Sequence, residues 1–514
     1  GNTFPLASIQ GSYIGYRRIT EQVSTDIGYT EWIFKTDTNH KAQYFRSFPS
    51  LPEYLIDDQA GKIEITRNYN NVGNVVQSKG NLYTTYDYQN SDVSYNVRSY
   101  SVCNGVNFVV SQYIVPTRFV YVSGVTHVKD NVTVQTSFEH SGLPDNTGLT
   151  ASQFQNTDAK NHRTEYLYPN TYPYNNSVKN ELLVQNRIGS PWQTIIKING
   201  SVVDGTEVNY AYVDPFTGIV ADPSAYVAGA KVYPALEKRR EVTWTSGSLI
   251  DGGWQSQKEY VNYDLVTGKP KEIKITNWTP NHYMTWSATG KMLNYQYHNY
   301  IQSFSYDPQS DELVNRVFID GTTDSYTYDP VLRLQTITNN PKNVITRFTY
   351  KYANSTDGVS YIKTRQTYPV VLGSSIDSLV DVTYVDGLGK DLQFIKKYGS
   401  SSPTADVIEA LEYDNAGRPT KKYVPLEAEN NHGNFYAGVF NGGFTNSIYQ
   451  PNPLSRQSSI TPPSWYATTT SYSTNSTGLT NPEGLTYPSN GLMITSLTDP
   501  DANIIEQYTD KAGR

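Results

Sequence analysis

The sequence predicts an all-β protein in which short antiparallel hairpins follow one another along one curved sheet. The first observation is a phrase that recurs along the chain: an aromatic residue, an acid or a substitute, two or three turn residues, glycine, and then arginine or lysine. The second is composition, because 44 of the 514 residues are Tyr while only 37% are apolar, which suits a sheet partly exposed to solvent. The third is length, which exceeds one compact core and requires several domains or an extended array.

Residues 1–250 are expected to form an irregular β-rich region with degenerate hairpins. Runs such as Val106–Ile114 and Thr194–Ile198 have the composition of strands. Degenerate copies of the phrase occur at Tyr69–Asn74 and Tyr212–Gly218, with long and uneven gaps between them. We therefore interpret this half as the same sheet carrying insertions rather than as an unrelated domain.

Residues 251–424 carry the regular repeats. The clearest copy is Tyr413–Arg418, and successive aromatic residues from Tyr263 to Tyr350 lie about twenty residues apart. A period of this length accommodates two strands of roughly seven or eight residues and two turns. Each unit is thus a hairpin that can bury its apolar surface only against its neighbours.

The positions of the phrase have separate structural roles. The aromatic residue ends a strand, and the acid accepts hydrogen bonds from backbone N–H groups about two residues further on. Glycine supplies the left-handed conformation that reverses the chain, and the cation begins the returning strand, where it can lie over the aromatic ring of its own or the next unit. We interpret the aspartates as turn formers rather than catalytic acids. The assigned turn residues are Tyr263, Asp264, Gly268, Lys269, Trp286, Gly290, Lys291, Tyr328, Asp329, Arg333, Tyr384, Asp386, Gly389, Lys390, Tyr413, Asp414, Gly417, Arg418, Tyr508, Asp510, Gly513 and Arg514.

Residues 425–496 interrupt the rhythm and are expected to form a loop-rich insert with many Gly, Pro and aromatic residues. No copy of the phrase is visible there, and prolines punctuate the segment. An ordered lid or plug lying on the sheet is one interpretation, and a ligand- or partner-binding loop is the other. Tyr436 and Trp465 are the candidate glycan or partner contacts. Residues 497–514 begin a further repeat, so we expect the chain to be part of a longer protein.

Charge and cysteine content argue against several classes of protein. The net charge is -7 and no basic cluster stands out, so nucleic-acid binding is not expected. The single cysteine, Cys103, excludes an intrachain disulfide framework and is expected to be a small buried residue. The apolar stretches are far shorter than the ~20 residues that a membrane-spanning helix needs.

Catalytic and metal-binding motifs are not apparent in the sequence. The histidines do not show the spacing of a zinc protease, and the glycines around Lys390 lack the spacing of a phosphate-binding loop. Asp57-Asp58 and Asp499–Asn503 group oxygen ligands without matching a calcium-binding loop, and we interpret both as turns. We therefore expect no cofactor, no metal and no enzymatic activity, with a β-rich hydrolase as the alternative.

The recurring phrase resembles the YD repeat of bacterial Rhs proteins, which also occurs in the B and C components of insecticidal toxin complexes and in animal teneurins. The motif carries this resemblance most specifically across Tyr263–Tyr423, where Tyr384–Val424 reads as two consecutive units. Gln450–Arg456 together with Pro462–Trp465 resembles a domain that precedes the main repeats in Rhs-like surface proteins of outer-membrane bacteria.

The resemblance implies a β-strip that spirals into a hollow shell, which in several family members encloses a C-terminal toxin. The implied function is a non-catalytic structural segment of a large secreted or cell-surface bacterial protein that is exported across the outer membrane. Its partners would be other segments of the same polypeptide or an enclosed toxin, together with secretion-machinery or surface proteins. The alternative is a surface adhesin or glycan-binding protein that uses exposed aromatic residues. No stretch of this chain matches the family's self-cleaving aspartyl site.

Overall fold

The computed structural model has the all-β fold that the sequence predicts. Among the described residues, 31 strands form one sheet, and its neighbouring strands pair antiparallel throughout. The structure describes residues 16–24, 27–35, 59, 61–87, 94–101, 108–115, 118–141, 143, 147–173, 176–187, 189–221, 231–245, 248–353, 359–368, 378–481 and 484–513.

The strands of the sheet follow one another in chain order with few exceptions. The first part of the ribbon consists of β1 (Arg18–Ser24), β2 (Gly28–Phe34), β3 (Ile63–Tyr69), β4 (Val75–Asp87), β7 (Arg118–Lys129), β8 (Val132–Glu139), β9 (Ala151–Gln155), β10 (Asn161–Leu167), β11 (Gln193–Ile198), β12 (Ser201–Val213), β13 (Lys231–Thr245) and β14 (Ser248–Tyr263). The middle part consists of β15 (Pro270–Ile275), β16 (Trp278–Trp286), β17 (Met292–Tyr297), β18 (Tyr300–Tyr306), β19 (Leu313–Val317), β20 (Thr323–Tyr328), β21 (Leu334–Asn340), β22 (Val344–Lys351), β23 (Ser360–Thr367), β24 (Ser378–Val385), β25 (Asp391–Lys397) and β26 (Ala405–Tyr413).

The last part of the ribbon is interrupted more often. It consists of β27 (Pro419–Tyr423), β28 (Leu426–Glu429), β29 (Phe444–Tyr449), β30 (Gln457–Thr461), β31 (Thr468–Thr474), β34 (Met493–Thr498) and β35 (Ile504–Thr509). Both β27 and β28 pair with β26, so they continue one another along the same side of that strand. Two further hairpins stand apart from the sheet, namely β5 (Ser94–Ser101) with β6 (Phe108–Val115) and β32 (Leu479–Thr480) with β33 (Thr486–Tyr487).

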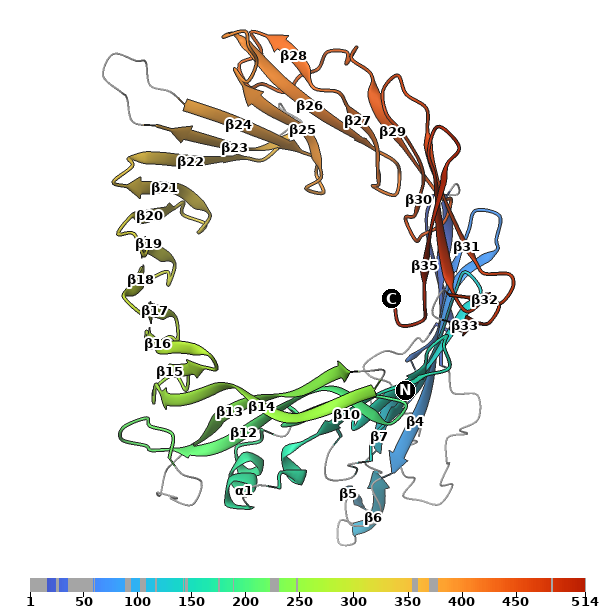
Figure 1. The fold of residues 1–514 in the computed structure, drawn as a ribbon, viewed down its shortest axis with the longest axis vertical. Helices are drawn as coiled ribbons and strands as arrows, with labels where there is room; N and C mark the ends of the chain where they lie inside the picture. Colours follow the sequence, from blue (N-terminus) through green and yellow to red (C-terminus); the bar gives the residue numbers. More distant parts are fainter. Residues whose placement is uncertain are drawn as a thin grey trace.

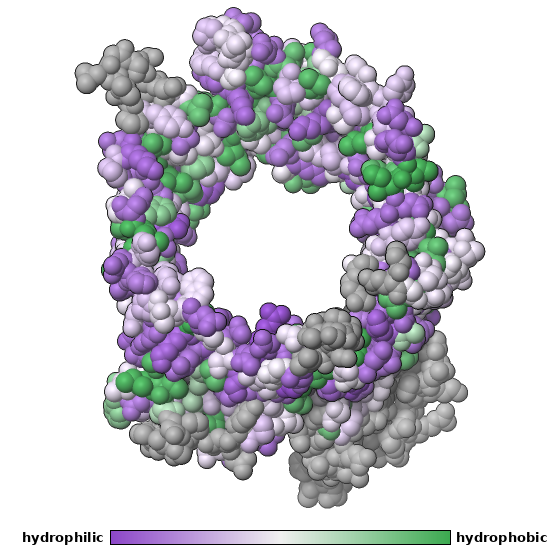
Figure 2. Space-filling model, in the orientation of Figure 1, coloured by the Kyte–Doolittle hydropathy of each residue, from purple (hydrophilic) through white to green (hydrophobic). Residues whose placement is uncertain are grey.

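The ribbon of strands curves into a ring with an open centre (Figure 1). The centre stays open when the side chains are drawn (Figure 2). Because neighbouring strands are antiparallel, the turns between them alternate between the two rims of the ring. We call the rim that carries the turns at 264–268, 287–290 and 414–417 the motif rim, and the other the opposite rim.

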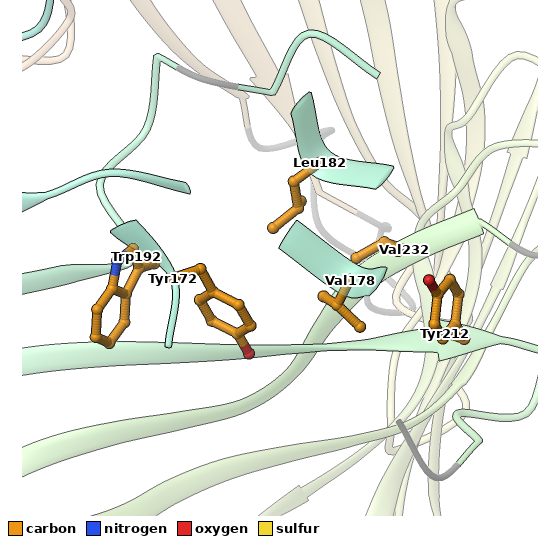
Figure 3. Packing of buried hydrophobic residues seen from close by; sticks show 6 residues of the cluster. All are labelled: Tyr172, Val178, Leu182, Trp192, Tyr212 and Val232. Atoms are coloured by element: carbon orange, nitrogen blue, oxygen red, sulfur yellow. The ribbon is translucent and has the colours of Figure 1, made fainter. Parts of the chain in front are cut away.

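Apolar packing is divided among small clusters rather than gathered in one core. Helix α1 (Asn176–Val184), which follows the short 3-10 turn η2 (Pro169–Thr171), lies on the outside of the ring (Figure 1). Its Val178 and Leu182 project toward the strands that carry Tyr212 and Val232 (Figure 3). Val178 and Leu182 are both fully buried, and burying a side chain of this size contributes about 1.5–3 kcal/mol. No helix in the described part of the chain is long and apolar enough to cross a membrane.

Residues 425–496 differ from the loop-rich insert that the composition suggests, because they contribute strands to the same sheet. Strand β29 pairs with β27 and β30, and β31 pairs with β34. The described prolines of this segment lie between its strands, where they cost no ladder hydrogen bond. The loop 430–443 resembles a lid, since Tyr436 and Phe440 pack on the cluster of Val382 and Ile395.

Candidate functional site: repeat turns and the seam of the ring

In the repeats that carry an acid, its carboxylate fixes the turn that follows the aromatic residue. Asp386 Oδ1 accepts hydrogen bonds from the backbone N–H groups of Leu388 and Lys390, both at 2.8 Å. Asp414 Oδ1 accepts the equivalent bonds from Ala416 and Arg418, both at 2.9 Å. The bond from the Lys390 N–H lowers the pKa of the Asp386 carboxyl, which therefore stays ionised as a turn former.

A left-handed residue then reverses the chain. The turn glycines at 268, 290, 389, 417 and 513 all have positive φ, with Gly417 at 75°. At Gly218 the need for glycine is also steric, since a Cβ there would lie 2.2 Å from the Tyr263 carbonyl oxygen. The degenerate Tyr328 unit keeps the left-handed conformation without glycine, because Leu332 adopts φ 62°.

Consecutive units are joined by the same pair of contacts. Lys269 Nζ lies 4.7 Å from the centroid of the Trp286 ring, and Trp286 Nε1 donates to the Pro270 carbonyl at 2.8 Å. The cation of one unit therefore covers the aromatic ring of the next unit. That ring in turn hydrogen-bonds the backbone directly after the cation.

The same arrangement recurs further along the motif rim. Arg333 lies 4.5 Å from the Tyr350 ring centroid, while the Tyr350 hydroxyl donates to the Leu334 carbonyl at 2.9 Å. Lys390 covers Tyr413 at 5.6 Å, and the Tyr413 hydroxyl donates to the residue after that lysine at 2.7 Å. The sequence allows the cation to lie over the aromatic ring of its own unit or over that of the next unit. In these units it lies over the ring of the next unit.

Sequence reasoning missed one unit, which spans residues 449–456. The Tyr449 hydroxyl donates to the Pro419 carbonyl at 3.0 Å, and Arg456 lies 4.7 Å from the Tyr472 ring centroid. Gln450 occupies the position of the acid, which hid the copy in the sequence. The signal that could have revealed the unit was an aromatic residue, Tyr449, followed by two turn prolines and an arginine, Arg456.

The last strands meet the first strands along a seam between the two rims. The Asn71 N–H donates to the Pro451 carbonyl at 3.0 Å. Arg456 Nη1 donates to Asp130 Oδ1 at 2.7 Å, and its Nη2 contacts Asp130 Oδ2. Asn71 and Asp130 belong to turns on the opposite rim, whereas Pro451 and Arg456 belong to a motif-rim turn. The ribbon thus completes one circuit, and its last strands lie against its first strands. We call the first strands the first layer and the last strands the second layer.

A second group of seam contacts is almost fully buried. Asn156 Nδ2 donates to Asp510 Oδ2 at 2.8 Å. Thr157 Oγ1 donates to the Gly491 carbonyl at 2.6 Å and accepts from the Lys511 N–H at 3.2 Å. The repeat turn that begins at Tyr508 is therefore part of the seam, and its acid bonds the first layer of the ribbon as well as its own turn.

A cavity lies beside this group of contacts. It has a volume of about 620 Å³ and takes its lining from both layers, with Asp158 and Lys160 on one side and Leu492 and Tyr508 on the other. Asp158 and Lys160 form an ion pair at 3.0 Å. The pocket thus separates the two layers at this place, while the hydrogen bonds of Asn156 and Thr157 join them beside it.

The two aromatic candidates differ in their surroundings. Tyr436 is half-buried, and its backbone exchanges hydrogen bonds of 2.8 and 2.9 Å with the Gln393 side chain, so it anchors the loop 430–443 rather than facing a ligand. Trp465 is 74% exposed and stands beside Tyr466, which is 80% exposed. Of these two, Trp465 is the residue placed to contact a partner.

The remaining candidates give no metal centre within the described ranges. Asp499 Oδ1 accepts from the N–H groups of Asp501 and Asn503 at 2.9 and 2.8 Å, which makes the segment a turn. No group of three or more His, Cys, Asp or Glu in the described part of the chain is placed to hold a metal ion. His40, Asp57, Asp58, Cys103 and Arg514 lie outside the described residues.

Comparisons with known proteins give one family model and several solved structures. The model described as a domain of unknown function (DUF6443) matches residues 360–477, which include the Tyr449 unit. No curated protein sequence matches the chain.

The solved structures are similar to the chain at low sequence identity. The crystal structure of TcdB2-TccC3 has a TM-score of 0.49 and 11% identity over 94% of this chain, and that of TcdB2-TccC3-Cdc42 a TM-score of 0.49 and 10% identity over 94%. The pore structure of the Photorhabdus luminescens Tc holotoxin has a TM-score of 0.27 and 10% identity over 91%. The chain spans 31%, 33% and 26% of those three chains, respectively.

Proposed function

We propose that this chain is a non-catalytic, shell-forming segment of a large Rhs-like, YD-repeat protein that is secreted or displayed on a bacterial surface. The observation that carries the proposal is the continuous antiparallel ribbon that closes on itself around an open centre (Figures 1 and 2). A sheet of this form bounds space without a solid core, and pairing along the ribbon leaves few strand edges open to aggregation.

The enclosed partner in this proposal is another part of the same polypeptide or a toxin domain attached to it. The repeat turns support a structural role for the acids, because their carboxylates are committed to backbone N–H groups of their own turns. Export across the outer membrane is part of the proposal and follows from the resemblance of the repeats.

Single-particle electron microscopy of the full-length protein tests the shell. We expect a hollow ring or barrel with additional density inside it. Compact particles without an internal space would overturn the shell, whereas a hollow particle with all further domains outside would overturn enclosure alone.

A glycan-binding adhesin is the second candidate, supported by the adjacent exposed side chains of Trp465 and Tyr466. A glycan array tests it with the intact chain. The adhesin requires saturable binding that Trp465→Ala abolishes and Trp278→Ala preserves, since Trp278 is 53% exposed elsewhere on the ring. No saturable binding, or equal loss in both variants, would exclude this role for Trp465.

A further inference from the structure

We propose that the turn 449–456 is a charge-dependent latch, and that the ring opens where this turn meets Asp130. The inference rests on the proposed shell function, because a latch has a purpose only where closure encloses something. It gives a specific role to a repeat unit that departs from the motif.

Two regular units show what the arginine does when the acid is present. Arg333 Nε donates to Asp329 Oδ2 at 2.7 Å, and Arg418 Nε donates to Asp414 Oδ2 at 2.7 Å. Each arginine therefore pairs with the acid four residues before it, inside its own turn. Its charge is already neutralised locally.

The latch unit lacks that internal partner. Gln450 follows the aromatic residue where the regular units carry aspartate, so the turn offers no carboxylate to Arg456. The guanidinium instead forms a two-pronged pair with Asp130, a residue 326 positions away in the first layer of the ribbon. Loss of the acid thus converts a contact within one turn into a contact between layers.

The surroundings make this pair stronger than an ordinary surface ion pair. The side chains of Arg456 and Asp130 are only 11% and 18% exposed. The guanidinium also lies over the Tyr472 ring, which fixes its plane. A planar, two-pronged pair shielded from water gains more from charge than an exposed pair does.

Among the described residues, the rest of the seam is thin compared with the sheet. One hydrogen bond at Asn71, two at Asn156 and two at Thr157 join the layers, and a pocket lies beside Tyr508. Strand pairs within the ribbon instead share continuous ladders, such as the eight paired positions of β23 and β24. Local opening is therefore expected at the seam before any strand separates.

Hydrogen exchange of the intact chain, read by mass spectrometry, tests the latch. The amides of Asn71 and Lys511 donate across the seam and report its opening, whereas the β20–β21 ladder reports the sheet. We expect Arg456→Ala and Asp130→Ala to accelerate exchange at the seam amides on the order of ten-fold and to leave the ladder unchanged. Raising the salt concentration should accelerate seam exchange in the wild type.

Matched variants separate the latch from general damage. Arg333→Ala removes the same side chain from a regular unit and should leave seam exchange unchanged. Gln450→Asp should accelerate seam exchange, because the restored acid offers Arg456 a partner in its own turn. Exchanging the charges, with Asp130→Arg and Arg456→Asp together, should restore protection relative to either single change.

The outcomes distinguish the latch from the shell. Unchanged seam exchange in Arg456→Ala and Asp130→Ala would overturn the latch while leaving a hollow ring intact. Acceleration by Arg333→Ala of the same size as that by Arg456→Ala would also overturn it. Wild-type particles without a hollow centre in electron microscopy would instead overturn the shell on which the latch depends.

Discussion

Left-handed turn positions show how single residues set the shape of the ribbon. The regular units place glycine there, while the Tyr328 unit places Leu332 at φ 62°. A residue with a Cβ is strained in that region by roughly 1–2 kcal/mol, whereas glycine enters it freely. The exposed turn at 329–333 therefore carries strain that its neighbours avoid.

Leu332→Gly is expected to stabilise the protein by about 0.5–1 kcal/mol, after the extra flexibility of glycine in the unfolded chain is allowed for. The Leu332 side chain is 51% exposed, so little packing is lost. Chemical denaturation measures the change. Leu332→Ala keeps the Cβ and should show no such gain; equal stabilisation by both variants would contradict the argument.

The turn acids give the molecule a predictable response to pH. In Asp329 the hydrogen bond from the Arg333 N–H lowers the pKa of the carboxyl. A lowered pKa in the folded state adds stability above the unfolded value of about 4, and this stability is lost as pH falls through the folded pKa.

Asp329→Asn should consequently flatten the fall in melting temperature between neutral and acidic pH. Thermal unfolding at a series of pH values between about 7 and 3 measures this slope. The asparagine is expected to keep the turn, because at Asn70 an uncharged Oδ1 already accepts the hydrogen bond from the Asn74 N–H at 2.8 Å. Identical slopes for the variant and the wild type would show that Asp329 adds no pH dependence.

At the scale of the hairpin, neighbouring units depend on one another through the hydrogen bond that the aromatic side chain of one unit donates to a backbone carbonyl of the unit before it. The Tyr350 hydroxyl donates to the Leu334 carbonyl, and the Arg333 guanidinium covers the same ring. A hydrogen bond of this kind contributes about 0.5–1.5 kcal/mol net, and the ring contact adds to it.

Tyr350→Phe should cost about 1 kcal/mol of unfolding free energy, because it removes the hydroxyl and keeps the ring under Arg333. Tyr352→Phe is the control, since Tyr352 is 71% exposed and its hydroxyl also contacts Arg333. We expect the control to lose less than about 0.5 kcal/mol by denaturant unfolding. A larger loss in Tyr352→Phe than in Tyr350→Phe would show that the exposed Tyr352 hydroxyl makes the more important contact.

Hairpins also show which features are readable from sequence. The turn at Asp414 depends on residues within five positions of one another, so its residue types alone predict its conformation. The Tyr449 unit escaped notice because it lacks the acid, and Asn452, three residues after the tyrosine, accepts the hydrogen bond from the Leu454 N–H instead. The Ser- and Thr-rich strands β30 and β31 lack the apolar alternation that marks a half-buried strand, and neighbouring strands determine their pairing instead.

At the scale of the whole molecule, sequence could predict curvature but not the place where the ribbon meets itself. Asn156 and Asp510 are 354 positions apart, and nothing local to either residue specifies the other. Their meeting depends on the accumulated twist of the strands between them. Charge and hydrogen-bonding capacity then select the register once the layers are close.

Thr157 is the residue with which that register can be tested. Its Oγ1 donates to the Gly491 carbonyl and accepts from the Lys511 N–H, and its side chain is almost fully buried. Thr157→Val preserves shape but leaves both backbone groups without this partner, a local cost of about 1–3 kcal/mol. We expect small-angle X-ray scattering to show a larger radius of gyration, with the main unfolding transition little changed. Thr157→Ser keeps the hydroxyl and should scatter like the wild type; expansion in Thr157→Ser but not in Thr157→Val would mean that the methyl group, rather than the hydrogen bonds, holds the seam.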